Sequence, residues 1–105
     1  MLDVINATRY YWSVIVSFAD RDTEVLAGGR RVRRFVSIEK VARRKLRQLE
    51  IASSLEDLRV PPGNRLEALK GSRKGQKSIR VNDQWRLCFT WSAIGPVDVE
   101  IVDYH

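Results

Sequence analysis

The spacing of hydrophobic positions changes near the middle of the chain. In the first half, apolar residues recur three or four positions apart, which is typical of one buried face of a helix. This stripe consists of Ile38, Val41, Ala42, Leu46, Leu49 and Ala52. In the second half, apolar residues recur at every second position, which is typical of a strand with one buried face. The pattern therefore predicts helices followed by a sheet.

Capping and turn residues divide the helical half into segments. The β-branched and aromatic run at residues 14–18 predicts a first strand. Asp20 is suited to cap a short helix that ends at Gly28, and Ser37 is suited to cap the long helix. The Pro-Pro-Gly-Asn sequence at residues 61–64 is the strongest turn signal in the chain. The strand pattern begins after this turn.

The second half predicts a series of hairpins. Residues 77–81 alternate between two faces, and the Asn-Asp-Gln sequence at residues 82–84 predicts a reversal into a strand. Gly95 and Pro96 predict a second reversal into the last strand. Hairpins in series make an antiparallel sheet, so we expect a small α+β domain with about four to five strands and the N-terminal helices packed on one face. The buried face would carry Ile79, Val81, Leu87, Phe89, Val99 and Ile101.

The opposite face of the sheet is the candidate functional surface. The alternation predicts that it displays Arg80, Arg86 and Tyr104. Cys88 falls on the same face and is expected to be inert, because no base lies near it in sequence. The aromatic residues of the same strand, Trp85, Phe89 and Trp91, share the parity of Leu87 and are assigned to the core.

Charge adds a partner class to this picture. Lys and Arg number 19 against 13 Asp and Glu, which gives a net charge of +6. One basic cluster spans residues 30–47, and its helical part is expected to be a solvated face made of Arg43, Arg44, Lys45, Arg47 and Gln48. A second basic cluster spans residues 65–86. Such clusters favour a polyanionic partner over a purely solubilising role.

Composition excludes several classes of protein. A chain of 105 residues fits one domain. One Cys and one His are too few for a Cys/His zinc cage, and one Cys makes no internal disulfide, so we expect no metal and no cofactor. The sequence shows no signal peptide and no apolar run of membrane-spanning length, and a cytoplasmic location is expected.

Three motifs in order resemble one known family. They are the Leu-Lys-Gly sequence ending at Gly71 and followed by Arg73, the Ile-Arg-Val-Asn and Trp-Arg pair at residues 79–86, and the terminal Val-Asp-Tyr-His. Together they resemble the HigB-like toxins of the RelE/ParE superfamily of bacterial toxin–antitoxin systems. The resemblance covers residues 13–105 as a single domain and leaves residues 1–12 as an extension, which we expect to be dispensable.

The resemblance implies a toxin that cleaves messenger RNA in the ribosome, without a metal, and that a HigA-like helix-turn-helix antitoxin neutralises. It implies catalytic roles for Lys70, Asp103, Tyr104 and His105, and phosphate binding by Arg73 and Arg86. Where many members carry histidine, this chain has Glu67. Contacts to RNA are also expected from Lys74, Arg80, Arg43, Arg44 and Arg47. For the three arginines of the long helix, the alternatives are docking of the antitoxin and a plain solvated face.

The chemistry of metal-free RNA cleavage constrains these roles. It needs a base for the ribose 2′-hydroxyl, cations for the charged phosphorane and an acid for the departing 5′ oxygen. His105 is the only histidine and is assigned as the acid, with Glu67 or Asp103 as the base. Tyr104 either stacks on a base or is an ordinary tyrosine at the end of a sheet. The alternative functions are a non-catalytic ParE-type inhibitor of DNA gyrase and a weakly active, degenerate toxin.

Overall fold

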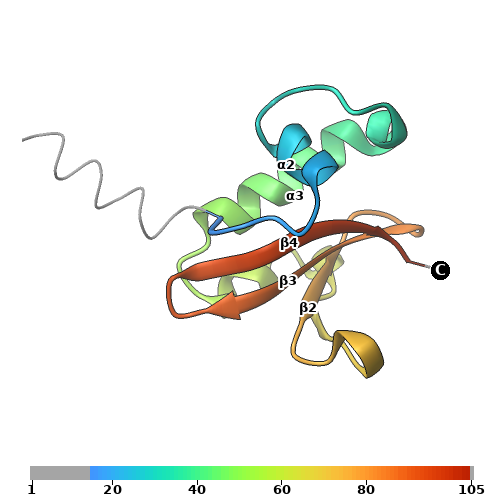
Figure 1. The fold of residues 1–105 in the computed structure, drawn as a ribbon. Helices are drawn as coiled ribbons and strands as arrows, with labels where there is room; N and C mark the ends of the chain where they lie inside the picture. The colour runs from blue at the N-terminus through green and yellow to red at the C-terminus, as the bar shows by residue number, and fades with distance from the viewer. Residues whose placement is uncertain (1–14, 105) are drawn as a thin grey trace, which may run out of the picture.

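Helices and strands follow one another along the chain in the order that the pattern predicts. The computed structural model describes residues 15–104, and within them an antiparallel sheet has the strand order β1-β2-β3-β4. Figure 1 shows the two helices, α2 and α3, together on one side of this sheet. The α+β expectation, with helices on one face, is confirmed. The bounds are α2 Arg21–Ala27, α3 Glu39–Ile51, β1 Glu67–Ala68, β2 Lys77–Arg80, β3 Trp85–Ser92 and β4 Gly95–Asp103.

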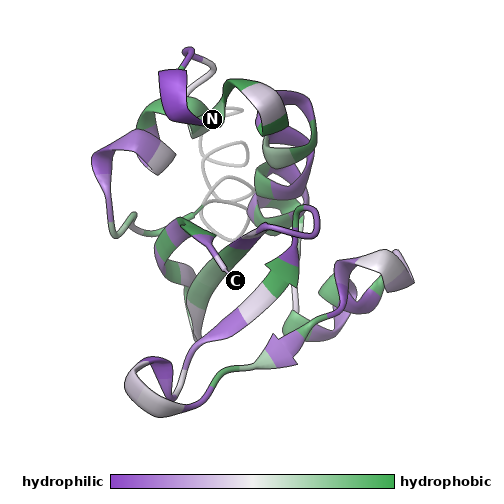
Figure 2. Cartoon of the chain, turned by 90° about the vertical axis from the view of Figure 1, so that its right-hand side faces the viewer, coloured by the Kyte–Doolittle hydropathy of each residue, from purple (hydrophilic) through white to green (hydrophobic). Residues whose placement is uncertain are grey.

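The core lies between the helices and the sheet. Leu26 of α2, Leu49 of α3 and Leu87 of β3 are completely buried there. Phe35 and Trp85 meet edge to face, with their ring centroids 5.5 Å apart. Figure 2 shows that the strands carry both hydrophobic and hydrophilic residues. The six sheet positions predicted for the core are all buried, and the stripe on α3 packs against them.

The two helices begin differently from each other. Asp20 occupies the N-cap position of α2 and Gly28 its C-cap position, as predicted, but the Asp20 carboxylate accepts a hydrogen bond from Arg34 instead of capping the helix. The prediction that Ser37 caps the long helix is wrong. Ser37 lies within a 3-10 helix, η1 (Arg33–Ile38), which continues directly into α3. No extended residue is left at that junction for a side-chain cap.

The predicted strand at residues 14–18 is reduced to one bridge in the part of the chain that is described. Phe18 pairs in parallel with Val99 of β4, and the amide of Val16 donates to the carbonyl of Pro96. Residue 14 lies outside the described residues. The ladder is not regular here because Asp98 of β4 has a φ of 53°, which turns its backbone out of the extended conformation.

Two tight connections shape the sheet. The reversal at residues 82–84 is confirmed, and Asn82 accepts hydrogen bonds from the amides of Gln84 and Trp85. Between β1 and β2 the chain forms a short 3-10 turn, η4 (Gly71–Arg73). Gly71 and Gly75 have φ values of 65° and 96°, a region that glycine adopts without strain. This turn projects away from the helices at the lower right of Figure 1.

Candidate RNA-binding face of the sheet

One cross-strand row defines the sheet face that points away from the helices. Glu67 of β1 pairs with Ser78 of β2, Ser78 pairs with Cys88 of β3, and Cys88 pairs with Glu100 of β4. Paired residues of antiparallel strands have their side chains on the same face. The row therefore carries a carboxylate at each end and two small side chains between them.

Arg86 is fixed on this face by several groups. Its Nε donates to Ser78 Oγ at 2.7 Å, and its Nη2 donates to the carbonyl oxygen of Arg65 at 2.7 Å. Its Nη2 also lies 3.6 Å from a carboxylate oxygen of Glu67, and the guanidinium carbon lies 6.0 Å from the ring centroid of Tyr104. The structure thus brings two predicted site residues, Glu67 and Tyr104, to the guanidinium of a third, Arg86.

Arg73 reaches the other end of the same row. Its Nη1 donates to Gln76 Oε1 at 3.0 Å and lies 3.3 Å from Glu100 Oε1. The backbone of Arg73 lies in η4, outside the strands, and its side chain extends to Glu100 of β4. The two arginines that the family resemblance assigns to phosphate therefore lie over opposite ends of one polar row.

The expectation of an openly displayed face is wrong for two residues. Arg86 is buried, with 9% of its surface exposed, and Cys88 is completely buried. The alternation correctly assigns both to the polar face, but Arg73 and Arg86 lie across that face and Leu69 of the β1–β2 connection is buried too. Long arginine side chains cover their neighbours in this way.

Burial also accounts for the chemistry of the single cysteine. Desolvation raises the pKa of the Cys88 thiol, and the Glu100 carboxylate raises it further, while the Arg73 and Arg86 guanidinium groups act in the opposite direction. A thiol with a raised pKa holds little thiolate near neutral pH. The structure therefore agrees with the expectation that Cys88 is not a nucleophile.

The end of the chain lies beside the β2–β3 turn. The amide of Tyr104 donates to the carbonyl of Gln84, and Asp103 accepts a hydrogen bond from Gln84 Nε2 at 3.0 Å. Tyr104 is 40% exposed, so part of its ring is available to solvent. His105 lies outside the described residues.

The remaining candidates of the sheet occupy its connections. Lys70 and Lys74 flank η4, and both are exposed. Arg80 pairs with Asp83 in the β2–β3 turn, and its register partner across the hairpin is Arg86. These cations lie at the β1–β2 and β2–β3 connections.

The basic face of α3 is not uniformly solvated, which corrects the prediction for Lys45. Lys45 is buried, and its Nζ donates to Asn64 Oδ1 at 2.5 Å. Asn64 is itself fully buried and donates to Gln48 Oε1 and to the carbonyl of Leu58. Burial lowers the pKa of Lys45, and the charges of Arg44 and Arg80 lower it further. The helix periodicity could not reveal this because the covering turn comes from residues 58–64.

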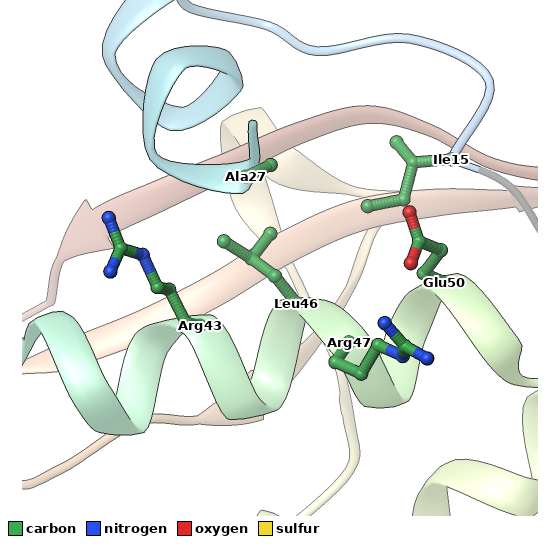
Figure 3. A pocket seen from close by; sticks show the side chains of 6 residues that line it. All are labelled: Ile15, Ala27, Arg43, Leu46, Arg47 and Glu50. Atoms are coloured by element: carbon green, nitrogen blue, oxygen red, sulfur yellow. The ribbon is translucent and has the colours of Figure 1, made fainter. Parts of the chain in front are cut away.

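The other predicted arginines of α3 lie on the helical side of the sheet, away from the row. Arg44 and Arg47 are exposed, while Arg43 is partly buried and lies 3.5 Å from Glu39. Figure 3 shows Arg43 and Arg47 on either side of Leu46, along a groove of about 210 Å³ between α2 and α3. They form a basic surface separate from Arg73 and Arg86.

Residues 15–104 contain neither a cluster of metal ligands nor a membrane-spanning helix. Among the described residues, no group of three or more His, Cys, Asp or Glu side chains is arranged to hold a metal ion. Within residues 15–104, no helix has the length and apolar character needed to cross a membrane.

Sequence reasoning missed three residues that organise the face. Ser78 and the carbonyl of Arg65 hold Arg86, and Glu100 holds Arg73. The hairpin register around residues 82–84 contains a signal for the first, because it places Ser78 diagonally opposite Arg86. No sequence signal points to the Arg65 carbonyl, whose direction depends on a left-handed backbone with φ 46°.

The fold and this face define a small cationic α+β domain with arginines across its sheet. Comparison with known proteins identifies its family: the RelE-like toxins of the type II toxin-antitoxin system HigB match residues 27–105. The chain belongs to this HigB-like toxin family. The family expected from the three motifs is thereby confirmed.

Two curated relatives match a shorter segment. Toxin HigB-1 of Vibrio cholerae serotype O1 is 56% identical over 55 residues, which are 52% of this chain and 58% of that protein. An uncharacterized protein of Haemophilus influenzae is 40% identical over 55 residues, which are 52% of this chain and 54% of that protein. The chain thus spans little more than half the length of the curated relatives it matches.

Proposed function

We propose that the protein is the toxin of a type II toxin–antitoxin system and that it cleaves messenger RNA on the ribosome without a metal ion. The observation that carries this proposal is the convergence of Glu67, Arg86 and Tyr104, with Arg73 across the same row. Two guanidinium groups can offset the negative charge of a phosphorane, and a carboxylate on the same face can take the proton of a ribose 2′-hydroxyl.

The proposed reaction is an attack by the ribose 2′ oxygen on the adjacent phosphorus. A base removes the 2′-hydroxyl proton, the bond from phosphorus to the 5′ oxygen breaks, and an acid returns a proton to that oxygen. The products are a 2′,3′-cyclic phosphate and a 5′-hydroxyl. Glu67 or Asp103 serves as the base and His105 as the acid, while Arg73, Arg86 and Lys70 offset the charge on phosphate.

The position of Glu67 favours a role as the base over that of an ordinary solvated carboxylate. Its Oε1 lies 3.6 Å from Arg86 Nη2, while 55% of its side-chain surface is exposed. It therefore borders a group assigned to phosphate and remains open to an incoming ribose. Tyr104, half exposed beside the same guanidinium, is proposed to stack on a base of the RNA.

Further partners follow from the same proposal. A HigA-like helix-turn-helix antitoxin is proposed to neutralise the toxin, and ribosomal RNA is proposed to contact Arg43, Arg44 and Arg47. Because ribosomes are the site of action, the proposed location is the cytoplasm.

Mapping of cuts in messenger RNA tests the function. After brief expression of the protein in growing bacteria, primer extension should show new 5′ ends within translated messages. An Arg86→Gln variant, expressed to the same level, is the matched control and should show none. Growth arrest without new cuts would overturn the nuclease proposal and favour inhibition of DNA gyrase, which a supercoiling assay with purified protein would detect.

A further inference from the structure

Each arginine across the sheet face is held by a carboxylate at one end of the same row. Arg86 is near Glu67 at 3.6 Å, and Arg73 is near Glu100 at 3.3 Å. A carboxylate on a surface that binds RNA opposes binding, because it repels phosphate. Glu67 has a proposed role in the reaction, whereas Glu100 has none so far.

The surroundings of Arg73 indicate what Glu100 does. Arg73 starts from a turn bounded by Gly71 and Gly75, and apart from their chain neighbours no residue comes within 4 Å of the place where a Cβ would stand on either glycine. The turn is therefore not fixed by packing at these two positions. The side chain gains its position from its far end, where Nη1 contacts Gln76 and Glu100.

These contacts leave the rest of the guanidinium for a ligand. Among the described residues, the partners that contact the guanidinium of Arg73 all contact Nη1, while its backbone bonds to Lys70 and Gln76. The side chain keeps 31% of its surface exposed. Arginine recognises phosphate through two parallel N–H groups, so a guanidinium held at one nitrogen can still present Nη2 and Nε to an anion.

We propose that Glu100 is a positioning residue, which holds Arg73 over the sheet so that its remaining N–H groups meet a phosphate of the bound RNA. The inference rests on the proposed nuclease function and deepens it. Glu100 touches neither the RNA nor the reacting atoms; it acts through Arg73. Its carboxylate lowers the affinity for RNA and raises the rate of cleavage, because a pre-oriented donor needs no reorganisation during the reaction.

Glu100→Gln separates binding from cleavage. The substitution keeps the shape of the side chain and an acceptor oxygen but removes the charge. We expect RNA affinity to rise about two- to fivefold, the scale of one partly exposed ion pair. The single-turnover cleavage rate should fall about tenfold, because a catalytic group displaced by a fraction of an ångström loses much of its effect. A side chain that only stabilises the fold would leave the affinity unchanged.

The matched control is Glu56→Gln. Glu56 pairs with Arg59 on the 3-10 helix η2 (Leu55–Arg59), at 2.7 Å, so the control also breaks an acid–arginine pair and also adds one positive charge. Binding is measured on programmed ribosomes whose messenger RNA carries a 2′-O-methyl group at the cut site, and cleavage on the unmodified RNA. If Glu100→Gln behaves like Glu56→Gln in both assays, the inference is overturned.

A double variant tests whether Glu100 acts through Arg73. In an Arg73→Gln background, Glu100→Gln should cause no further loss of cleavage, because the residue it positions is already gone. Rate losses that multiply would overturn the inference. Glu100→Asp in the otherwise unchanged chain should recover part of the rate, since it restores the charge.

A measurement on the free protein tests the role of Glu100 independently of the proposed nuclease function. The Nε–H signal of Arg73 in ¹⁵N NMR should report an ordered side chain, and Glu100→Gln should make it mobile, whereas Glu56→Gln should not. Unchanged order of Arg73 in Glu100→Gln overturns the inference whatever the RNA result. Absence of cleavage by the unsubstituted protein would overturn the nuclease proposal, while the NMR comparison would still decide whether Glu100 holds Arg73.

Discussion

At the scale of single residues, the buried thiol of Cys88 gives a direct test of how closed the sheet face is. Burial raises the pKa of this thiol, so the reactive thiolate is scarcer in the folded protein than in an exposed cysteine at the same pH. We expect a disulfide reagent at pH 8 to label native Cys88 only at the rate of local opening, and to label the urea-unfolded chain at once.

A relocated thiol is the control for this labelling experiment. Ser37 is exposed, so a Ser37→Cys variant that also carries Cys88→Ala should react rapidly in the native state. Labelling of native Cys88 at that same rate would contradict a closed face. It would mean that Arg73 and Arg86 do not cover the row in solution.

The chain end carries the sharpest prediction at this scale. Deleting His105 removes an imidazole and leaves the buried positions of β4 in place, so the fold should survive. Loss of a general acid should slow cleavage roughly 10²- to 10⁴-fold. His105→Gln should behave likewise, since glutamine exchanges no proton near neutral pH. Single-turnover cleavage on programmed ribosomes measures this, and full activity in the deletion would remove histidine from the mechanism.

Asp103 distinguishes two versions of the same reaction. Asp103→Asn should cost less than the His105 deletion if Asp103 only orients the imidazole, and as much if Asp103 is the base. Asn keeps an acceptor for Gln84 Nε2, which contacts Asp103 at 3.0 Å, so the β2–β3 turn should stay intact. Circular dichroism and the urea midpoint verify that the fold is unchanged.

Residue by residue, the sequence predicts which face a side chain occupies more reliably than how exposed it is. Alternation places Cys88 and Arg86 on the polar face correctly. Arg73, which lies across that face, starts from a turn that the strand pattern does not describe, and Arg86 is held by Ser78 and the carbonyl of Arg65. Exposure depends on such long-range neighbours, whereas face depends only on the local period of the chain.

At the scale of elements, Lys45 and Asn64 connect α3 to the turn that precedes β1. Asn64→Ala would leave the buried ammonium of Lys45 and the carbonyl of Leu58 without their partner. Unpaired buried groups of this kind cost about 2–3 kcal/mol together. We expect the urea midpoint to fall accordingly, and Asn82→Ala, which removes a half-buried turn acceptor, to cost only about 1 kcal/mol.

A double variant identifies the source of that cost. In the Asn64→Ala background, Lys45→Met removes the unpaired ammonium and should recover part of the lost stability. If the losses of stability from the two substitutions simply add, the Lys45 ammonium does not depend on its contact with Asn64. The measurement is the free energy of unfolding in urea for the four members of the cycle.

The basic surface of α3 predicts a salt-dependent contact. Replacing Arg43, Arg44 and Arg47 with Glu should weaken binding to ribosomes without unfolding the domain, because two of the three are exposed and, within residues 15–104, Arg43 has only Glu39 near it as an ion-pair partner. For the unsubstituted protein, log affinity should fall with log salt by about 0.7–0.9 per neutralised phosphate. Binding that is independent of salt would count against this contact.

Elements with a strong local signal are predicted well, and those that depend on a partner are not. The α3 stripe, the turn at residues 61–64 and both hairpins follow from periodicity and turn residues. The segment before α2 reads as a strand, yet it forms one bridge, because the irregular backbone at Asp98 interrupts the ladder. Ser37 does not cap α3, because it lies within η1, which continues directly into α3.

At the scale of the whole molecule, the two basic surfaces lie on different sides of one sheet. Arg73 and Arg86 lie across the polar face, and the arginines of α3 lie on the helical side. When one partner binds the α3 surface of this protein, the polar face of the sheet can therefore still contact a second partner. This arrangement suits a toxin that is proposed to contact ribosomal RNA and messenger RNA together.

The boundary of the folded domain gives the last prediction. Residues 16–19 are attached to β4: Val16 donates to Pro96, Ala19 donates to Val99, and Ser17 accepts from Val99. Each such hydrogen bond contributes about 0.5–1.5 kcal/mol, so together they are a sizeable part of the ~5–15 kcal/mol that stabilises a domain. Without them the edge of β4 would be open to aggregation.

Removing residues 1–10 should therefore leave a folded protein, whereas removing residues 1–19 should not. The first truncation keeps the three backbone hydrogen bonds that residues 16–19 make to β4, and the second deletes them together with Phe18, which packs against the core. Soluble yield and the urea midpoint of the two truncated chains, compared with the full chain, measure the difference. Loss of soluble protein on removal of residues 1–10 would make the extension part of the core and would shift the domain boundary from residue 13 toward the start of the chain.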